Sequence, residues 1–320
     1  MRIMRAAFAS TFDADNPLAA LTVGERPEPV HPADDWLTVE VRASSLNRHD
    51  LWSLVGVGLS VEQLPMILGC DAAGIDPDGN EVLVYPVVLD PADPRGVSIL
   101  SEKFQGTLAE RVAVPRGNLV PVPAGLSLTD AACLPTAWLT AYRMLTDRGR
   151  IDEGDAVLVQ GAGGGVATAA VVLAVAMGKR VYATSRDAAK RDRIAALGAT
   201  AVAPGARLPE RVDVVIETVG AATFDHSMKS ARPGARIVVS GATSGHEPKV
   251  NLRRVFALQL EILGTSMGTP AELAELLAFC VDRGVRPVVD SVHGFSQVAD
   301  AFARLQSGEV FGKVVLDHTR

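Results

Sequence analysis

The segment VLVQGAGGGVATAA, residues 157–170, restricts the fold of this chain more than any other feature of its sequence. A strand-like apolar run ends at Gln160, glycines occupy 161 and 163–165, and a helix of small residues is expected from there on. Glycines permit a tight turn and let a pyrophosphate approach the amides at a helix N-terminus, where the helix dipole favours anions. A glycine-rich turn that binds nothing is the alternative. The pattern predicts a dinucleotide site with contacts from Ala162, Gly163, Gly164, Gly165 and Val166.

Strand and helix patterns alternate through this half of the chain. The segments AVLVQG, KRVYATS, VDVVIETVG, ARIVVSG and LEILGTS have the composition of strands, whereas VATAAVVLAVAMG and DAAKRDRIAALG have that of helices. Strands that are apolar throughout are buried on both faces, which is typical of a parallel sheet covered by helices. We therefore predict an α/β fold with a doubly wound parallel sheet. Two helices, AELAELLAFCVDRG and VADAFARLQSGE, and a last strand, GKVVLD, are expected after it.

Residues 1–130 differ from this pattern, with frequent prolines and short β-type runs such as WLTVEVRAS, EVLVYPVV and AERVAVP. Short strands at this spacing, separated by turn residues, predict a partly open β-barrel or a compact mixed sheet. The segment GLSLTDAACLPTAWLTAYRML then predicts a helix. Ser127 or Thr129 is its expected N-cap, and Pro135 must interrupt or restart it.

The end of the second strand of the parallel sheet indicates which cofactor is preferred. An NAD site usually has an Asp or Glu here to hold the ribose 2′-hydroxyl. This chain has Ser185 and Arg186 instead, with Lys190 one helical turn further on. A hydroxyl and two cations suit a 2′-phosphate, so we predict NADPH. The alternative is that both cations are solvated surface charges, partly offset by Asp187.

Composition and charge exclude several classes of function. The 320-residue chain has a net charge of -6, which does not suit a nucleic-acid groove. Its cysteines, Cys70, Cys133 and Cys280, are too widely spaced for a disulfide framework, which indicates a reducing, cytoplasmic environment. The N-terminus does not resemble a signal peptide, and the most apolar stretch is too short to span a bilayer. We therefore expect neither a nucleic-acid partner nor a membrane partner.

The order of these parts resembles the medium-chain dehydrogenase/reductase superfamily. The matching segments are SSLNRHDLW (44–52), LPMILGCDAAG (64–74), GTLAERVAVP (106–115), AACLPTAWLTAY (131–142), GAGGGVA (161–167) and LGTSMGT (263–269). The resemblance implies a Rossmann dinucleotide-binding domain at 137–269 and a β-rich, GroES-like, partly open barrel at 1–136 and 270–320 for the substrate. It also implies a homodimer formed through LEILGTS (260–266), because an exposed apolar edge strand invites pairing.

The zinc enzymes of this superfamily hold a catalytic zinc with a Cys, with the His of a G-H-E motif, and with a further Cys or Asp. Register on the flanking residues places Asn47, Cys70 and Thr136 at these positions, with Asp71 in place of the Glu. Asn and Thr are poor zinc ligands. Residues 86–105 also lack the four cysteines of the family's structural zinc lobe. The resemblance therefore implies no metal; Cys70 is expected to be a small uncharged pocket wall, and Asp71 to accept hydrogen bonds from nearby amides.

These departures resemble the zinc-independent branch of quinone oxidoreductases and 2-alkenal or enone reductases. The implied reaction is NADPH-dependent hydride transfer to a small-molecule quinone or α,β-unsaturated carbonyl. The conjugated π system spreads the negative charge onto oxygen, where fixed hydrogen-bond donors stabilise it. Two alternatives stay open: an alcohol dehydrogenase-type enzyme with an atypical zinc site, and a non-catalytic NADPH-binding redox sensor.

The resemblance assigns catalytic positions to Asn47, His49 and Thr136. Asn47 would donate to a substrate carbonyl or orient the nicotinamide, although an Asn here could simply cap a turn. His49 lies where zinc enzymes carry the hydroxyl that starts a proton relay, and it could protonate the product. A hydrogen-bonded histidine without a catalytic role is the alternative. Thr136 would line the former metal pocket.

Further cofactor contacts are implied by the same resemblance. Arg48 would contact the pyrophosphate, with a surface salt bridge as the alternative, and Thr140 would pack against the nicotinamide. The remaining implied contacts are Thr218, Val219, Gly241, Ala242, Ser266, Met267 and Lys313. Thr218 and Val219, and likewise Gly241 and Ala242, follow predicted strands of the parallel sheet, at the carboxyl edge where ligands bind.

Overall fold

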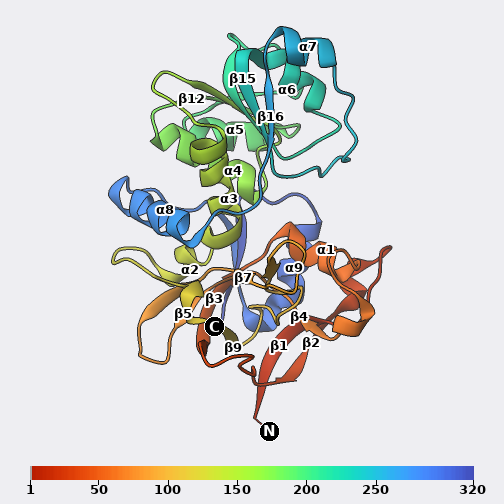
Figure 1. The fold of residues 1–320 in the computed structure, drawn as a ribbon, viewed down its shortest axis with the longest axis vertical. Helices are drawn as coiled ribbons and strands as arrows, with labels where there is room; N and C mark the ends of the chain where they lie inside the picture. The colour runs from red at the N-terminus through yellow and green to blue at the C-terminus, as the bar shows by residue number, and fades with distance from the viewer. Residues whose placement is uncertain (1) are drawn as a thin grey trace. The chain divides into compact units, whose positions relative to one another are not determined.

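A computed structural model describes residues 2–320 of the chain, which form two compact units. Unit 1 contains the residues up to 136 together with 273–281 and 289–320, and unit 2 contains 137–272 and 282–288. The predicted α/β fold, with a parallel sheet and a separate β-rich part, is confirmed (Figure 1). Among the described residues, none of the helices combines the length and apolarity that crossing a bilayer requires.

Unit 1 is built from short strands and helices drawn from both ends of the sequence, and the C-terminus lies in it (Figure 1). Its strands are β1 (Ile3–Ala9), β2 (Leu21–Pro27), β3 (Trp36–Ser45), β4 (Met66–Ile67), β5 (Asp71–Ile75), β6 (Glu81–Val84), β7 (Val87–Leu89), β8 (Val97–Ile99), β9 (Arg111–Pro115), β10 (Leu119–Pro121), β17 (Val289–Gly294) and β18 (Lys313–Asp317). Its α-helices are α1 (Arg48–Leu54), α2 (Leu128–Ala131) and α9 (Val298–Gln306).

Strand β3 is the central element of unit 1. The main sheet has the order β10-β6-β5-β3-β18-β17, and β9 also pairs with β3. Its neighbours β5, β9 and β18 all run antiparallel to β3. Because β18 comes from the end of the chain, this pairing places residues 315–317 beside residues 43–45. Val39 and Val41 on β3 pack into an apolar core with residues of β5, β6 and β9.

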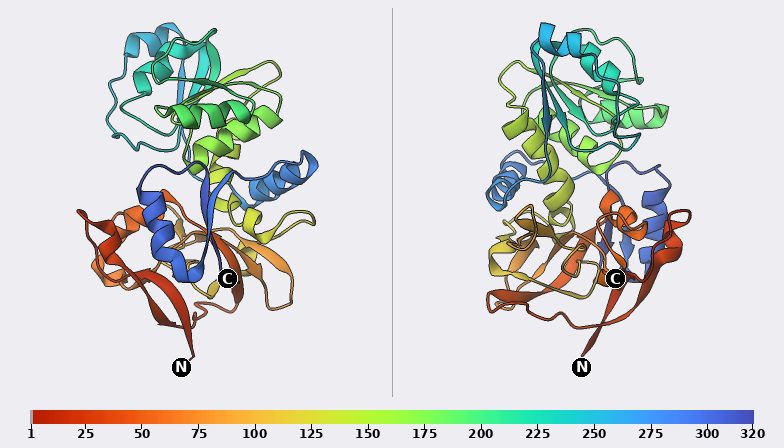
Figure 2. Two further views of the ribbon diagram at one scale, coloured as in Figure 1. Left: turned by 180° about the vertical axis from the view of Figure 1, so that it is seen from behind. Right: turned by 45° about the vertical axis from the view of Figure 1, so that its right-hand side comes forward.

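Unit 2 contains a six-stranded sheet in the order β13-β12-β11-β14-β15-β16, in which every pair is parallel. This order reverses direction between β11 and β14, and ligands of doubly wound sheets bind at the carboxyl end of such a switch point. Helix α4 packs on β11 and β12 while α6 packs on β14 and β15 (Figure 2). The strands are β11 (Ala156–Val159), β12 (Arg180–Thr184), β13 (Thr200–Val202), β14 (Val212–Glu217), β15 (Ala231–Val239) and β16 (Glu261–Gly264). The helices are α3 (Leu139–Arg143), α4 (Gly165–Ala176), α5 (Ala188–Ala196), α6 (Phe224–Ser230) and α7 (Leu252–Ala257).

The expected helices at 125–145 and after 270 are present. Ser127 caps α2, and its hydroxyl accepts a hydrogen bond from the Asp130 amide at 3.1 Å, as predicted. The helical stretch continues as a π-helical turn (Leu134–Trp138), α3 and a second π-helical turn (Met144–Arg148). Pro135 lies in the first of these turns, because proline cannot donate the amide hydrogen bond of a regular helix. Helix α8 (Pro270–Asp282) follows the parallel sheet.

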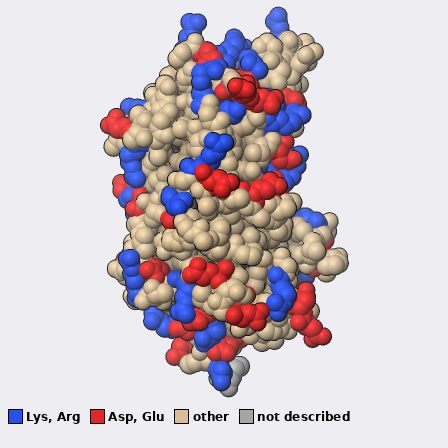
Figure 3. Space-filling model, turned by 90° about the vertical axis from the view of Figure 1, so that its left-hand side faces the viewer, with Lys and Arg blue, Asp and Glu red and all other residues tan. Residues whose placement is uncertain are grey.

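Positive and negative side chains are mixed over the surface. On the face drawn in Figure 3, Lys and Arg alternate with Asp and Glu, and no continuous basic stripe crosses it. A protein that binds nucleic acid normally gathers its cations on one face. The charge distribution on this face therefore gives no support to a nucleic-acid partner.

Candidate functional site

Three strands of unit 1 bring together polar residues that are far apart in the chain. Ser45 at the end of β3 pairs with Asp71 of β5 on one side and with Val315 of β18 on the other. Asn47 lies just beyond β3, at the N-cap of α1, and Lys313 begins β18. The side chains of Asn47, Asp71 and Lys313 therefore meet at the end of β3, where all three are buried.

The Lys313 ammonium is the centre of this cluster. Its Nζ donates to the Leu46 carbonyl oxygen at 2.9 Å, to Asn47 Oδ1 at 2.7 Å and to Asp71 Oδ2 at 3.1 Å. Asp71 Oδ2 also accepts from Ser45 Oγ and from Asn47 Nδ2, each at 2.9 Å. Three acceptors match the three protons of an ammonium, so the buried charge is fully hydrogen-bonded.

This geometry bears on two expectations. The Lys313 ammonium, for which the resemblance implies a cofactor contact, has its three protons directed at oxygens inside unit 1. The Asp71 carboxylate, which was expected to accept from nearby amides, accepts from the side-chain amide of Asn47 and also from Ser45 Oγ and the Lys313 ammonium. Asn47 is held at both ends of its amide, yet only one of its two Nδ2 protons is used by a described residue. The other proton is a donor that remains available.

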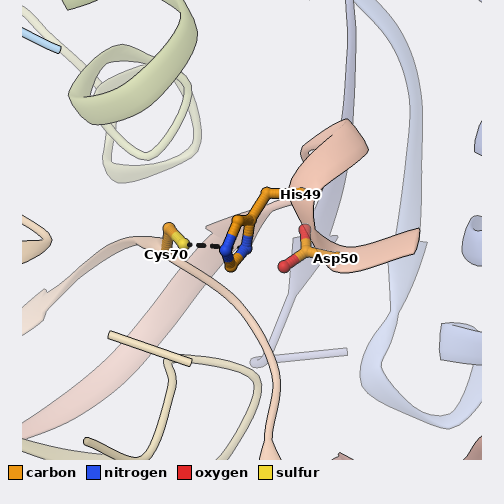
Figure 4. Close-up of side chains that lie close together, drawn as sticks. All are labelled: His49, Asp50 and Cys70. Atoms are coloured by element: carbon orange, nitrogen blue, oxygen red, sulfur yellow. Dashed lines mark hydrogen bonds between the residues drawn. The ribbon is translucent and has the colours of Figure 1, made fainter. Parts of the chain in front are cut away.

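His49, Cys70 and Glu102 form a second cluster next to the first. His49 Nδ1 lies 3.5 Å from Cys70 Sγ, and His49 Nε2 lies 3.1 Å from Glu102 Oε1. Figure 4 shows the Cys70 sulfur facing the imidazole, with the Asp50 carboxylate on the other side of the ring in this view. Both ring nitrogens are therefore engaged by the protein. No local pattern in the sequence pointed to Glu102, which lies 53 residues from His49.

The backbone around this cluster requires glycine at two positions. Gly69, just before Cys70, has φ of +96°, and a Cβ there would collide with Thr107 and Leu108. A Cβ on Gly74 in β5 would collide with the Glu40 carbonyl across the sheet. The Gly69 amide also donates to Asp50 Oδ1 at 3.1 Å. The two glycines thus let Cys70 and Asp71 approach α1 and β3 closely.

The charges of the second cluster are strongly coupled. The charge of Cys70, followed by hydrogen bonds to Cys70 and Glu102, raises the pKa of His49 to about 11 against the effect of burial. Burial raises the pKa of the Cys70 thiol, and His49 opposes this shift. The Glu102 carboxylate also attracts the ring's proton, which adds to the raised pKa of His49. A hydrogen bond joins Cys70 Sγ and His49 Nδ1, so one proton lies between these two atoms.

The superfamily's catalytic zinc does not fit the residues at its three ligand positions. The Asn47 oxygen already accepts a hydrogen bond from the Lys313 ammonium at 2.7 Å. A divalent cation at that oxygen would be repelled by the ammonium charge. Thr136 offers only a neutral hydroxyl, so among these three residues only Cys70 has a side chain that commonly binds zinc. These three positions therefore do not make up a zinc site.

The glycine-rich loop of unit 2 is tied to the neighbouring strand. The amide of Gly161 donates to Thr184 Oγ1 at 2.9 Å, and that of Ala162 donates to the Thr184 carbonyl at 2.8 Å. Gly161 has φ of +68°, and a Cβ on it would collide with the Val219 side chain. Helix α4 starts at Gly165 with Gly164 as its N-cap, at the carboxyl end of β11. The predicted strand–turn–helix cradle for a dinucleotide is therefore present.

The end of β12 presents cations, as the sequence suggested. Arg186 is exposed and forms no ion pair with any described residue. Asp187 is engaged as the N-cap of α5, where its side chain accepts from the Lys190 amide at 3.1 Å. Arg191 was not predicted; it donates to the carbonyls of Ser185 at 2.8 Å and Arg186 at 3.0 Å. Arg191 thus fixes the loop that carries the two predicted specificity residues.

A buried network, also missed from sequence, joins the carboxyl ends of three strands. Glu217 at the end of β14 accepts from the amides of Val219 at 2.9 Å and Gly220 at 3.0 Å. Gln160 after β11 accepts from Thr184 Oγ1 of β12 at 2.8 Å. These bonds fix the loops after β11, β12 and β14, which form the switch-point edge of the sheet. Thr218 and Val219 therefore lie on a loop that the Glu217 carboxylate fixes through hydrogen bonds to its amides.

The other predicted site residues are placed individually. Arg48 is exposed on α1 and is apart from the buried cluster of Asn47, while Thr140 is buried on α3. The remaining ones are half-buried or exposed in loops and turns: Thr136 in the first π-helical turn, Gly241 and Ala242 after β15, and Ser266 and Met267 after β16.

Removing the Lys313 charge should destabilise the protein strongly. Lys313→Met would leave the Asp71 carboxylate buried without a cation, and we expect a loss of about 3 to 5 kcal/mol in the free energy of unfolding, measured by urea denaturation. The double variant Asp71→Asn, Lys313→Met should recover part of the free energy of unfolding that Lys313→Met alone loses. The control is Lys229→Met, which breaks an exposed pair with Asp225 and should cost less than about 1 kcal/mol. Equal losses in Lys313→Met and the control would contradict the role given to this ammonium.

Comparison with known proteins agrees with the fold and the motifs. Residues 189–316 match the family model described as zinc-binding dehydrogenase. The chain is 28% identical to the zinc-type alcohol dehydrogenase-like protein YogA of Leptosphaeria maculans, over 89% of this chain and 91% of that protein. A solved structure titled NAD-dependent alcohol dehydrogenase superimposes with a TM-score of 0.88 at 33% identity, covering 98% of this chain and 99% of the other.

A further relative shares more than 30% of its sequence with almost the whole chain. The acryloyl-coenzyme A reductase of Metallosphaera sedula is 32% identical over 89% of this chain and 93% of that protein. The similarity extends over nearly the full length of both proteins. The chain therefore belongs to the medium-chain dehydrogenase/reductase superfamily of oxidoreductases.

Proposed function

We propose that this protein is an NADPH-dependent reductase of α,β-unsaturated carbonyls or quinones that does not use the superfamily's catalytic zinc. The observation that carries the proposal is the Lys313 ammonium on Asn47 Oδ1 at 2.7 Å, which excludes a second cation from that ligand position. Residues 1–136 and 270–320 would bind the substrate, and residues 137–269 would bind the cofactor.

The lack of fit for that zinc restricts the class of substrate. A simple ketone develops its negative charge on one oxygen, which a Lewis acid normally stabilises. A conjugated acceptor spreads the charge over several atoms, so fixed hydrogen-bond donors are sufficient. The similarity to acryloyl-coenzyme A reductase, whose name specifies a conjugated thioester, supports this choice. Quinones remain within the same chemical class.

Asn47 is the residue that we propose to stabilise the oxyanion. Its Nδ2 donates one proton to Asp71 and has a second proton to donate, while Lys313 fixes its Oδ1. An amide held at both ends does not need to reorganise when charge develops on the substrate. NADPH, when bound, would supply the hydride to the β-carbon of the acceptor; the Asn47 amide would then hold the oxygen that receives the electron pair, and water would supply the proton that completes the product.

The proposed preference for NADPH rests on the loop after β12. Ser185 and Arg186 follow the strand where NAD enzymes carry a carboxylate, and Arg191 holds both of their carbonyl oxygens. The Arg186 guanidinium is exposed and can form charge-assisted bonds with a 2′-phosphate. Because a structural relative is titled NAD-dependent, the preference must be tested directly.

The proposed homodimer forms through the edge of the parallel sheet. Strand β16 is the last strand in the sheet order, and Ile262 on it is 41% exposed. On the preceding helix α7, Leu252 and Phe256 are 71% and 72% exposed. An uncovered edge strand beside exposed apolar side chains favours pairing with a second copy of the chain.

The substrate class is tested by following NADPH oxidation with a panel of acceptors. We expect turnover with 2-alkenals, enoyl thioesters or quinones, and none with saturated ketones of the same length, because only the conjugated acceptors delocalise the charge. The matched pairs of conjugated and saturated compounds serve as internal controls. Preferential reduction of saturated ketones would contradict the proposal and favour the alcohol dehydrogenase alternative.

The cofactor preference is tested by Arg186→Ala. We expect the KM for NADPH to rise about tenfold, which corresponds to about 1.4 kcal/mol, the value of one hydrogen bond to a charged group. The KM for NADH should stay the same, because NADH lacks the 2′-phosphate. Arg193→Ala, at an exposed position of helix α5 that follows this loop, is the control. Equal effects on both cofactors would show that Arg186 does not bind the phosphate.

The dimer is tested by light scattering coupled to gel filtration. We expect the mass of two chains for the wild type and of one chain for Ile262→Lys, because a charge on the edge strand opposes pairing. Val30→Lys introduces the same charge at an exposed position of unit 1 and should leave the mass unchanged. A wild-type mass equal to one chain would contradict the proposed homodimer.

A further inference from the structure

We propose that His49, Cys70 and Asp50 bind a divalent transition-metal ion, Zn²⁺ or Co²⁺, at a site built from donors other than the superfamily's zinc ligands. Cys70 is the only member at a superfamily ligand position; the other two come from the first turn of α1. The inference goes beyond the proposed function, since the proposed reduction involves no metal.

The three donors lie close enough together to share one ion. Each offers one ligand atom, and the three atoms lie within 4.8 Å of one another. Around a tetrahedral zinc, bond lengths of about 2.3 Å to sulfur and 2.0 Å to nitrogen place these two atoms about 3.5 Å apart. The distance from Cys70 Sγ to His49 Nδ1 is 3.5 Å (Figure 4). Two of the donors thus have the separation that zinc requires, and the Asp50 carboxylate is the third donor within 4.8 Å.

Glu102 prepares His49 to act as a ligand. A carboxylate only accepts hydrogen bonds, so the contact of His49 Nε2 with Glu102 at 3.1 Å keeps a proton on Nε2. The lone pair of a neutral ring is then on Nδ1, which faces Cys70 Sγ. Histidines that bind metals almost always donate their other N–H to a carboxylate or carbonyl oxygen. This contact is a second observation, independent of the donor cluster, that indicates a metal.

The other two ligands are also supported by hydrogen bonds. Asp50 accepts from the amides of Asn47 at 2.7 Å and Gly69 at 3.1 Å, which orient its carboxylate without using all its lone pairs. The carbonyl oxygen of Leu100 lies 3.4 Å from Cys70 Sγ and is available as a fourth donor. Fixed carboxylates of this kind are usual around bound metals.

The chemistry of the donors selects the ion. Sulfur and imidazole favour zinc and neighbouring transition metals over Mg²⁺ and Ca²⁺, which need oxygen ligands. Cys70 and Asp50 are buried, whereas the His49 side chain is 21% exposed and gives access from solvent. The ion would take the place of the proton shared between Sγ and Nδ1, and that proton would pass to solvent. It would fasten α1 to the loop before β5.

The test uses the full chain, stripped with a chelator, loaded with Zn²⁺ or Co²⁺ and passed through gel filtration. We expect about one ion per chain by mass spectrometry, as for a single tetrahedral site. We also expect a thiolate-to-cobalt charge-transfer band in the near ultraviolet. Cys70→Ser should lose the band and His49→Gln should lose the bound ion. Glu102→Gln should keep the ion with an affinity about 10- to 100-fold lower, because the carboxylate that accepts the proton of His49 Nε2 is removed.

A matched control is Cys133→Ser, which removes another buried cysteine of unit 1 and should bind metal like the wild type. Circular dichroism on each variant shows whether it is folded. Two results would overturn the proposal. One is a wild-type metal content no higher than that of Cys70→Ser, and the other is a cobalt band that persists in Cys70→Ser. Rapid alkylation of Cys70 without metal uptake would also overturn the proposal. It would show instead that Cys70 and His49 form a thiolate–imidazolium pair.

NADPH oxidation by the stripped protein, measured with a conjugated acceptor, separates this proposal from the proposed function. Turnover without metal, together with metal binding in the loaded sample, supports both. Metal binding without turnover in either sample supports the site and contradicts the proposed function. Turnover without any metal binding contradicts the site alone.

Discussion

The buried ammonium of Lys313 is the interaction on which the arrangement of unit 1 depends. A charge excluded from water is tolerated only when oxygens surround it, and here they come from Leu46, Asn47 and Asp71. Satisfying it requires β3, β5 and β18 to be neighbours and orients the Asn47 amide. The same charge prevents a metal from using Asn47. One side chain thus sets strand order, donor geometry and the chemistry available to a substrate.

Features encoded locally could be predicted from the sequence. The glycine-rich turn, the apolar parallel strands and the Ser127 cap depend on residues within a few positions of one another, and all three are present. The exposed cations after β12 belong to the same class, because strand and loop are contiguous. Local rules of backbone geometry and burial are sufficient for such features.

The candidate site was less predictable, because its contacts join distant parts of the chain. Lys313 and Asp71 are 242 residues apart, and Glu102 is 53 residues from His49. Nothing near Lys313 distinguishes a buried lysine from a surface one, and Arg191 likewise resembled a solvated helix charge. The resemblance named Cys70 and His49 as separate positions, but only the folded chain shows that sulfur and imidazole face each other.

The position of β18 also affects the order in which the chain can fold. In the main sheet of unit 1, β18 lies between β3 and β17, although all of unit 2 separates it from β3 in the sequence. Unit 2 consists mainly of one continuous segment, so its contacts can form while the ribosome still holds the end of the chain. The sheet of unit 1 must wait with an unfilled position beside β3, and pairings over such a separation form slowly. During that interval Asp71 lacks its cation, and only water can solvate its carboxylate until the last strand arrives.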